Sequence, residues 1–486
     1  FYIQKRNLPE YNTNIGANVL GYIAEVNNSI IEKDDYYLMG DLIGKQGVEI
    51  SYEEELRGIK GIKFIQKDRF NRDVGSFKNG ELDIIPIAGK DLTITIDSEL
   101  QDYGEQLMNG KKGGIVAIDP SNGEILSLVS APSYNPNLLI GRNRSENYMD
   151  LYRDSIYKPL IDKSLLNMHA PGSPFKILVG LSALQEKAIT EKTSIFCNNY
   201  YQYGKEKRKM QCHCGGGYRN LSNALSLSCN SYFANAYRKT IDTKSPTKEA
   251  FDNWSNQMKS FGLGEYLNND LSVGKKGIIP DFDFYNKWYP DFKWGATTTL
   301  SNSIGQGEVL VTPIQLANMT AAIANKGYYY TPHIIKKIEG SEINSKFRTK
   351  NYTLIDSTHF EPIIEGLSKV YKSGTAKFLQ VPDIEICGKT GTAENFTKID
   401  GKKTQLTDHS IFVAFAPKDN PTIAISVLVE NGYYGSRWAG RIASLMIEKY
   451  IKGEVTLKNM EQLVMNKSLD EEYQKPFLDK PFKINQ

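Results

Sequence analysis

The alternation of apolar and polar residues first becomes regular near residue 88. Residues 88–97 alternate in the manner of a strand, and from Ser98 to residue 108 the apolar positions are spaced as on one face of a helix. Residues 119–123 contain Pro, Asn and Gly between two apolar runs, which predicts a hairpin turn. Because the preceding part has only short mixed segments, we place the start of the main domain here.

Strand-like runs return in the second half of the chain, at residues 382–388, 410–417 and 422–429. The spacing between Ser173 and about residue 325 is mostly helical, and residues 436–451 predict a closing helix. Together these patterns predict an α+β fold, in which a central antiparallel sheet is covered by helices.

Length and net charge indicate a protein of several domains that does not bind nucleic acid. The 486 residues suffice for about three parts, and we divide them into a smaller N-terminal domain (1–90), a main domain (91–455) and a C-terminal tail (456–486). The net charge is only +3 and Lys and Arg look scattered, so we expect no nucleic-acid partner. No run of about 18 apolar residues is present, so the sequence predicts no transmembrane helix.

The string Ser173-Pro-Phe-Lys176 is the first with chemical content. A Pro-Gly pair precedes Ser173, and Pro174 suits the first position of a helix, so the hydroxyl is expected at a helix N-terminus. Lys176 follows one turn later on the same face and could take the serine proton. Alone, such a string is more often a capping serine with a surface lysine.

Two later strings complete the constellation. In Ser228-Cys-Asn230, the serine could relay a proton and Asn230 could hold a substrate amide together with Lys176. Lys389-Thr390-Gly391-Thr392 follows a predicted strand, where the glycine would admit a substrate backbone. The backbone N–H near Thr392 could join that of Ser173 in an oxyanion hole.

A second lysine string, Lys372-Ser-Gly-Thr375, is discounted. It ends a stretch with helical spacing, so Gly374 is expected at a helix C-terminus, and no strand leads into it.

Four of the five cysteines cluster in sequence, at Cys197, Cys212, Cys214 and Cys229. Their spacing, with His213 between the middle pair, is compatible with a structural Cys₄ or Cys₃His zinc site. A disulfide between Cys197 and either Cys212 or Cys214, or buried free thiols, are the alternatives. Cys387 stands apart and is expected in the core.

Taken with their order, the three catalytic strings resemble those of a class B penicillin-binding protein of the elongation type. The resemblance covers nearly the whole chain and extends to further strings, at residues 47–58, 113–126, 303–307 and 311–318. It implies a transpeptidase domain like that of serine β-lactamases on an N-terminal pedestal.

By this resemblance the chain is a D,D-transpeptidase. Ser173 would attack D-alanyl-D-alanine stem peptides and would also be acylated by β-lactams. Lys176 would be the base, Ser228 and Asn230 the second element, and Lys389, Thr390 and Gly391 the third. Elongation-type relatives carry zinc ligands in the same stretch, which leaves the third ligand open between Cys214 and His213. No organic cofactor is implied.

The resemblance also implies a periplasmic location with an N-terminal membrane anchor absent from this sequence. A RodA-type glycosyltransferase and an MreC-type scaffold are the implied partners. The alternatives are a β-lactam-hydrolysing enzyme, a β-lactam sensor, and a non-catalytic elongation scaffold. Against the first, no equivalent of the deacylating glutamate is evident, and the intact Ser173, Lys176 and Lys389 argue against a pure scaffold.

Overall fold

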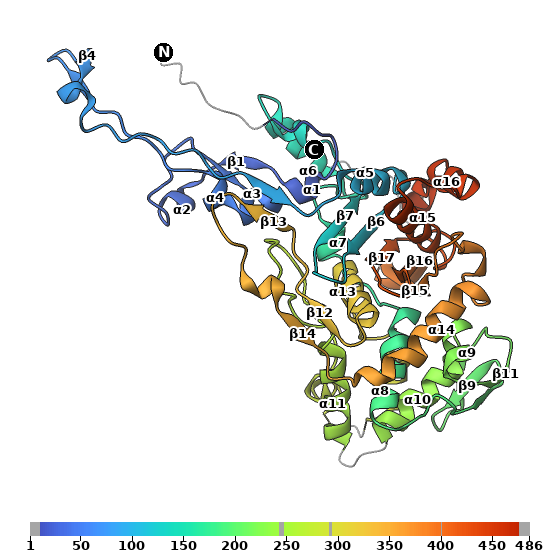
Figure 1. The fold of residues 1–486 in the computed structure, drawn as a ribbon. Coiled ribbons are helices and arrows are strands. Elements are labelled where there is room, and N and C mark those ends of the chain that lie inside the picture. The colour runs from blue at the N-terminus through green and yellow to red at the C-terminus, as the bar shows by residue number, and fades with distance from the viewer. Residues whose placement is uncertain (1–9, 243–246, 291–293, 400, 476–486) are drawn as a thin grey trace.

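The computed structural model describes residues 10–242, 247–290, 294–399 and 401–475. Its centre is a five-stranded antiparallel sheet in the order β15-β16-β17-β6-β7 (Figure 1). The strands are β6 (Gly113–Ile118), β7 (Ile125–Ala131), β15 (Cys387–Ile399), β16 (Lys402–Ala416) and β17 (Ile423–Val429). β15 lies at one edge, so within the described residues no other strand of the sheet pairs with its outer side.

Helices cover both faces of this sheet. Every residue of β6, β7 and β17 is buried, as expected for strands packed on both sides. α5 (Ser98–Leu107) and α15 (Ala439–Lys452) pack on one face and α13 (Pro313–Ala324) on the other. The predicted α+β fold is confirmed, as are the helix after Ser98 and the closing helix.

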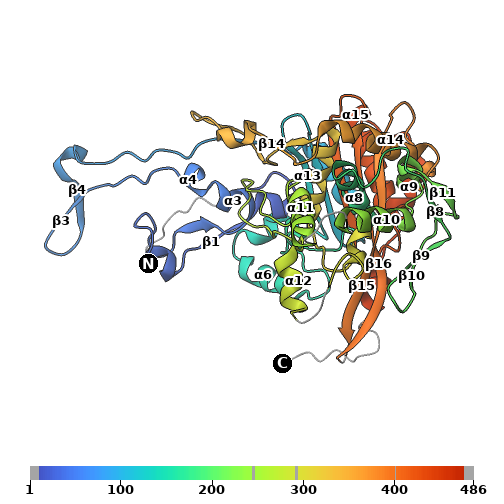
Figure 2. The same ribbon diagram turned by 90° about the horizontal axis from the view of Figure 1, so that it is seen from below.

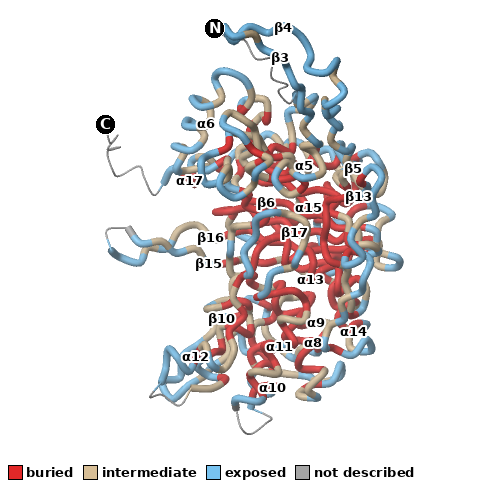
Figure 3. Tube along the Cα trace, turned by 90° about the vertical axis from the view of Figure 1, so that its left-hand side faces the viewer, coloured by how far each residue is buried: buried red, intermediate tan, exposed pale blue. Residues whose placement is uncertain are grey.

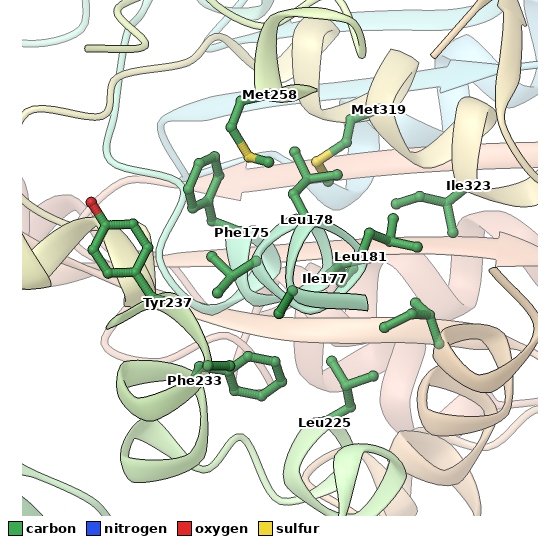
Figure 4. Packing of buried hydrophobic residues seen from close by; sticks show 14 of the residues in the cluster. Phe175, Ile177, Leu178, Leu181, Leu225, Phe233, Tyr237, Met258, Met319 and Ile323 are labelled. Carbon is green, nitrogen blue, oxygen red and sulfur yellow. The ribbon is translucent and has the colours of Figure 1, made fainter. Parts of the chain in front are cut away.

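A helical region adjoins the sheet, and α8 (Lys176–Gln185) lies at its centre. Residues 176–184 of α8 are all buried, so α8 is apolar around most of its circumference. Figure 4 shows Phe175, Leu178 and Leu181 packed among side chains from the surrounding helices. The labelled side chains around α8 come from α9 (Leu221–Ser226), α10 (Asn230–Asp242), α11 (Thr247–Lys259) and α13. Residues of α12 (Phe282–Trp288) and α14 (Phe360–Lys372) belong to the same apolar cluster. Close packing on all sides fixes the position of α8.

Four short strands between α8 and α9 form a small module that carries three of the clustered cysteines. β8 (Ile195–Cys197) pairs with β11 (Gly217–Arg219), and β9 (Tyr200–Tyr203) pairs with β10 (Arg208–Gln211). We call residues 195–219 the cysteine module. Its strands β8, β9 and β10 lie against α10.

The N-terminal part forms an extended pedestal. It begins with α1 (Ala17–Leu20), β1 (Ile23–Glu25), α2 (Asn28–Ile31), β2 (Leu42–Gly44), α3 (Gly47–Ser51) and α4 (Glu53–Leu56). Two antiparallel segments, joined by the bridges Ile59–Ile87 and Ile62–Ile84, then lead to a hairpin of β3 (Ile65–Lys67) and β4 (Asp73–Ser76). This arm, residues 59–87, projects far from the main domain and is mostly exposed (Figures 1, 2 and 3).

Smaller elements join the pedestal to the main domain. β5 (Leu92–Ile94) pairs with β13 (Ile335–Ile338), and β12 (Tyr328–Tyr330) pairs with β14 (Lys350–Tyr352). The strand predicted over 88–97 is therefore shorter, and it lies outside the central sheet. Two helices, α6 (Arg144–Arg153) and α7 (Lys163–Leu166), lie between β7 and α8 in the chain.

The C-terminal segment, assigned from sequence to a tail, is packed onto the main domain as far as residue 475. α16 (Lys458–Met465) and α17 (Asp470–Gln474) bring the buried Val464, Leu469 and Tyr473 into the same apolar cluster as α5 and α15. A hydrogen bond from the Tyr103 hydroxyl to Glu461 links α5 and α16. Among the described residues, no helix is both long and apolar enough to cross a membrane.

Candidate active site

The loop before α8 brings Ser173 against strand β15. Ser173 opens a 3₁₀ turn (Ser173–Phe175) that continues into α8, so its hydroxyl lies at a helix start as predicted. Gly172 has φ 62° and its N–H donates to the Gly305 carbonyl at 2.8 Å. A Cβ at residue 172 would lie 2.6 Å from the Thr392 carbonyl oxygen, so only glycine permits this approach.

Ser173, Ser228 and Lys176 form a hydrogen-bonded chain. The Ser228 hydroxyl donates to Ser173 Oγ at 2.9 Å. Lys176 Nζ donates to Ser228 Oγ at 3.1 Å, to the Ser228 carbonyl at 2.8 Å and to Asn230 Oδ1. The lysine is therefore connected to the nucleophile through the Ser228 hydroxyl. Ser228 itself has φ 55°, a left-handed conformation that is costly outside glycine and frequent at functional sites.

Two buried lysines determine the electrostatics of the site. Lys176 is fully buried, and burial lowers its pKa to about 8 although the neighbouring thiols of Cys212, Cys229 and Cys214 oppose the shift. Lys389 is also fully buried, and burial together with the charge of Lys176 holds its pKa well below the usual range. Neighbouring amines of this kind supply a neutral base near neutral pH.

The third string lies on the edge strand β15, as predicted, but the predicted strand at 382–388 is largely a turn and irregular backbone, and β15 begins only at Cys387. Lys389 Nζ donates to the Thr390 carbonyl at 3.1 Å, and Gly391 lies so close to the nucleophile loop that a Cβ would meet Pro174 Cδ at 2.6 Å. The Thr392 carbonyl accepts from Gln306 Nε2 at 3.0 Å. Because the N–H and C=O of one strand residue point to the same edge, the Thr392 N–H also faces the free edge, toward Ser173.

Thr375 is a residue of the site that the sequence argument discounted. α14 ends at Lys372, so the Lys372–Thr375 string is not on a strand, yet Thr375 Oγ1 lies 2.9 Å from Thr390 Oγ1. Gly374 lies just past the C-terminal end of α14, as expected, and glycine is required there because a Cβ would lie 2.3 Å from the Ser226 carbonyl oxygen. No local pattern signals this contact, which depends on how α14 packs beside β15.

The four clustered cysteines meet in space. Their sulfur atoms lie within 4.8 Å of one another, and all four residues are buried. The Cys212–Cys214, Cys214–Cys197 and Cys212–Cys229 sulfur distances are 3.5, 3.5 and 3.7 Å. A tetrahedral ion with bonds of about 2.3 Å would place its sulfurs about 3.8 Å apart, so the group could hold such an ion. None of the four forms a disulfide, and His213 is exposed outside the group.

This cysteine group is physically linked to the nucleophile. Cys229 lies between Ser228 and Asn230, and the Asn230 N–H donates to Cys212 Sγ at 3.1 Å. Asn230 Nδ2 donates to the Gln211 carbonyl on β10 at 2.7 Å. The conformation of the Ser228–Asn230 loop therefore depends on the cysteine module.

A buried charged cluster lies beneath the nucleophile loop. Glu430 Oε2 is 3.0 Å from Lys112 Nζ. Glu430 Oε1 accepts from Asn167 Nδ2 at 2.8 Å and lies 4.0 Å from His169 Nε2. The rings of His169 and His409 are 4.6 Å apart. His169 and His409 are far apart in the sequence, and the fold brings them together.

Most of the chain is similar in sequence to known protein families. Residues 113–448 match the penicillin binding protein transpeptidase domain, and residues 3–94 match the penicillin-binding protein dimerisation domain. The chain is 33% identical over 434 residues to the peptidoglycan D,D-transpeptidase MrdA of Acinetobacter baumannii, covering 86% of this chain and 62% of that relative. It is 30% identical over 442 residues to MrdA of Escherichia coli K12, covering 86% of this chain and 67% of that one.

Solved structures agree with this similarity. PBP2 of Pseudomonas aeruginosa in complex with WCK 5153 has a TM-score of 0.76 at 30% identity, with 94% of this chain and 95% of that chain covered. PBP2 of Helicobacter pylori in complex with MreC has a TM-score of 0.75 at 28% identity, with 91% and 79% covered. The chain spans about three fifths to two thirds of the curated relatives named above.

Proposed function

The chain belongs to the penicillin-binding protein transpeptidases of the elongation type, and on that premise we propose that it cross-links peptidoglycan stem peptides through an acyl-enzyme on Ser173. The observation that carries the proposal is the hydrogen-bonded chain from Lys176 through Ser228 to Ser173. It supplies a nucleophile together with a route for its proton.

Acylation follows from these contacts. Ser173 Oγ attacks the carbonyl between the two D-alanines, and its proton passes through the Ser228 hydroxyl to neutral Lys176. The N–H groups of Ser173 and Thr392 stabilise the oxyanion, and one such donor is typically worth about 10²–10³ in rate. As the C–N bond breaks, the proton returns through Ser228 to the leaving amine, and D-alanine departs.

Transfer reverses the sequence with a new amine. The acceptor amine attacks the Ser173 ester, loses a proton along the same route, and forms the cross-link as the Ser173 hydroxyl is restored. The substrate carboxylate would be held by Lys389 and by the hydroxyls of Thr390 and Thr375, which lie 2.9 Å apart. Thr375 thereby adds a binding residue to the predicted set.

The test is the mass of the intact protein after incubation with a penicillin, for wild type and Ser173→Ala. We expect a stable adduct on wild type alone, because a β-lactam acylates the same oxygen and its ester is not readily hydrolysed. Rapid turnover of the drug would support the β-lactam-hydrolysing alternative. The absence of any adduct would favour a non-catalytic scaffold.

We propose that the four cysteines bind a structural zinc ion. The sulfur separations match a tetrahedral thiolate site, and four protein ligands would leave no open position for chemistry. The same distances argue against a disulfide, which needs sulfurs about 2.05 Å apart. With Cys214 in the group and His213 exposed, Cys214 is the proposed third ligand. Zinc would hold the loop of Ser228 and Asn230 in position.

We further propose a periplasmic location with a membrane anchor preceding this sequence, and partners of the MreC and RodA types. The support is the similarity to a PBP2 solved with MreC and to a peptidoglycan synthase complex with a TM-score of 0.77. The pedestal arm also exposes large apolar side chains that a monomer leaves uncovered: Ile59, Ile62, Phe64, Phe70, Val74, Ile84, Ile85 and Ile87. Apolar surface on this scale is typical of a protein interface.

A further inference from the structure

Two hairpins beside the active site each carry a net positive charge. They are the β9–β10 hairpin (200–211) and the outer part of β15 and β16 (394–405), which we call the β15–β16 extension. Together these segments contain seven Lys or Arg and three Asp or Glu, a net charge of +4. Because the whole chain carries +3, the remaining residues have a net charge of −1. The two segments lie far apart in the sequence, and the fold brings both of them to the active site.

The β9–β10 hairpin turns a polar face outward. Tyr201 and Tyr203 pack against the helical core, so the alternate residues Gln202, Lys209 and Gln211 are exposed. Lys209 Nζ lies 4.5 Å from the centre of the Tyr200 ring. The Gln211 carbonyl accepts from Asn230, so this face begins at the active site. Lys205 and Lys207 continue it at the exposed turn.

The β15–β16 extension carries an unusual pair of like charges. Lys398 lies directly opposite Lys403, an arrangement that destabilises a hairpin unless an anion is present. Both are exposed, Lys403 Nζ lies 3.9 Å from the centre of the Phe396 ring, and Lys402 is exposed beside them. Within the described residues no carboxylate forms an ion pair with Lys398, Lys402 or Lys403.

Both hairpins project from the same side of the main domain (Figures 2 and 3). The outer edge of β15 leads from Lys389 and Thr392, beside the nucleophile, out to Lys398. The Thr392 carbonyl already accepts from Gln306, so the part of the edge beyond Thr392 is the part that a peptide could pair with. A peptide that pairs with this edge would therefore lie with basic residues along its length. Strand addition of this kind supplies backbone hydrogen bonds, while the flanking side chains select the ligand.

We propose that the two hairpins bind the acceptor strand of the cell wall, a carboxylate-bearing glycopeptide, while the donor is attached to Ser173. This inference rests on the proposed function and adds the means by which the second substrate is held. Amides, aromatic rings and lysines together suit a chain of sugars and acidic peptides. An anionic membrane surface would also attract these lysines, but it would not form backbone hydrogen bonds with the edge of β15.

Co-sedimentation with isolated peptidoglycan sacculi tests the proposal. Two triple variants, K205Q/K207Q/K209Q and K398Q/K402Q/K403Q, are compared with wild type and with their sixfold combination. The matched control, K336Q/K337Q/K346Q, removes three exposed lysines from the neighbourhood of β13, away from the hairpins. Labelled penicillin gives the fraction of each preparation with a functional Ser173, and binding is normalised to it.

We expect each hairpin triple to weaken binding at least ~3-fold, the sixfold variant at least ~10-fold, and the control less than ~2-fold, because charge contacts at an exposed surface are weak singly and act together. Wild-type binding should fall between about 50 and about 300 mM NaCl, as screening predicts. It should also be lost on sacculi whose carboxylates have been amidated.

Three outcomes would overturn the inference: a sixfold variant that binds like the control, undiminished binding to amidated sacculi, or a loss seen on phosphatidylglycerol vesicles but not on sacculi. The last would assign the hairpins to a lipid surface. If wild type forms no penicillin adduct, the proposed function fails. If the adduct forms and the variants bind sacculi normally, only the docking inference fails.

Discussion

Lys176 combines complete burial with three hydrogen bonds, and this combination makes acylation depend on pH. Its pKa is lowered to about 8 by burial, so the neutral form that accepts the Ser173 proton becomes more abundant as the pH rises. The rate of acylation by penicillin should therefore increase from pH 6 to about 8 and level off above it. Rate measurements over this range, with Ser173→Ala as the blank, test this; a rate independent of pH would contradict it.

His409 is a buried histidine whose protonation should make the stability of the fold depend on pH. Burial and the neighbouring His169 lower its pKa from 6.5 to about 3, while the nearby Glu430 opposes the shift. Since the folded pKa lies below the unfolded one, the unfolded chain takes up a proton first, and stability is lost as the pH falls below about 6.5. At pH 5 one such histidine accounts for about 2 kcal/mol relative to high pH.

The corresponding variant is His409→Asn, whose side-chain oxygen can still accept the Asn431 N–H that His409 Nδ1 accepts at 3.1 Å. Urea unfolding at pH 7 and pH 5 should show a smaller acid loss for this variant than for wild type. His359→Asn, at a half-buried site outside the cluster, is the control and should leave the acid loss unchanged. Equal acid losses in wild type and His409→Asn would exclude the assignment to His409.

At the level of elements, the group of four cysteines joins three residues of the cysteine module to Cys229 of the Ser228–Asn230 loop. If the proposed zinc ion is bound there, its loss should slow acylation, because the loop of Ser228 and Asn230 would lose its support. We expect Cys214→Ser to lose bound zinc, lower the melting temperature and reduce the acylation rate by about 10–100-fold, the usual range when the support of a site is removed.

His213→Ala serves as the control for the zinc prediction, because His213 is exposed and lies outside the four sulfurs. It should keep one zinc per chain and a normal acylation rate. Zinc is measured by elemental analysis on the same preparations used for acylation. Zinc loss from His213→Ala but not from Cys214→Ser would reverse the ligand assignment.

Across the whole molecule, the pedestal arm and the catalytic site lie far apart, so they can be tested separately. Phe70 and Ile85 on the arm are 63% and 80% exposed. Phe70→Asp with Ile85→Asp should weaken binding to an MreC-type scaffold at least about tenfold, because a charge in an apolar contact is costly to desolvate. Calorimetric titration with the purified scaffold measures the effect.

Leu354 is 56% exposed but lies on the main domain, so Leu354→Asp is the matched control for the arm variant. It should bind the scaffold like wild type. Penicillin acylation of each variant shows that the catalytic domain is folded. Equal weakening by both changes would mean that the arm is not the contact.

The sequence by itself determined the chemistry of the nucleophile and the class of fold. Ser173 and Lys176 are one helical turn apart, so local spacing sufficed to predict a helix start. The alternation at 382–388 placed a strand beside Lys389, but the strand itself begins at Cys387 and runs through the third string. The periodicity likewise predicted a sheet covered by helices. It did not predict that residues 456–475 pack against α5 and α15, because exposed and packed amphipathic helices have similar patterns.

Only the tertiary structure decided which distant residues meet. Thr375 contacts Thr390 because α14 ends beside β15, and His169 approaches His409 and Glu430 because the nucleophile loop crosses the end of the sheet. That Cys214, and not His213, joins the other three cysteines depends on which side chain turns inward from the loop after β10. Such contacts join residues far apart in sequence, and their geometry is set by packing rather than by local spacing. The approach of two basic hairpins that lie far apart in the sequence has the same origin.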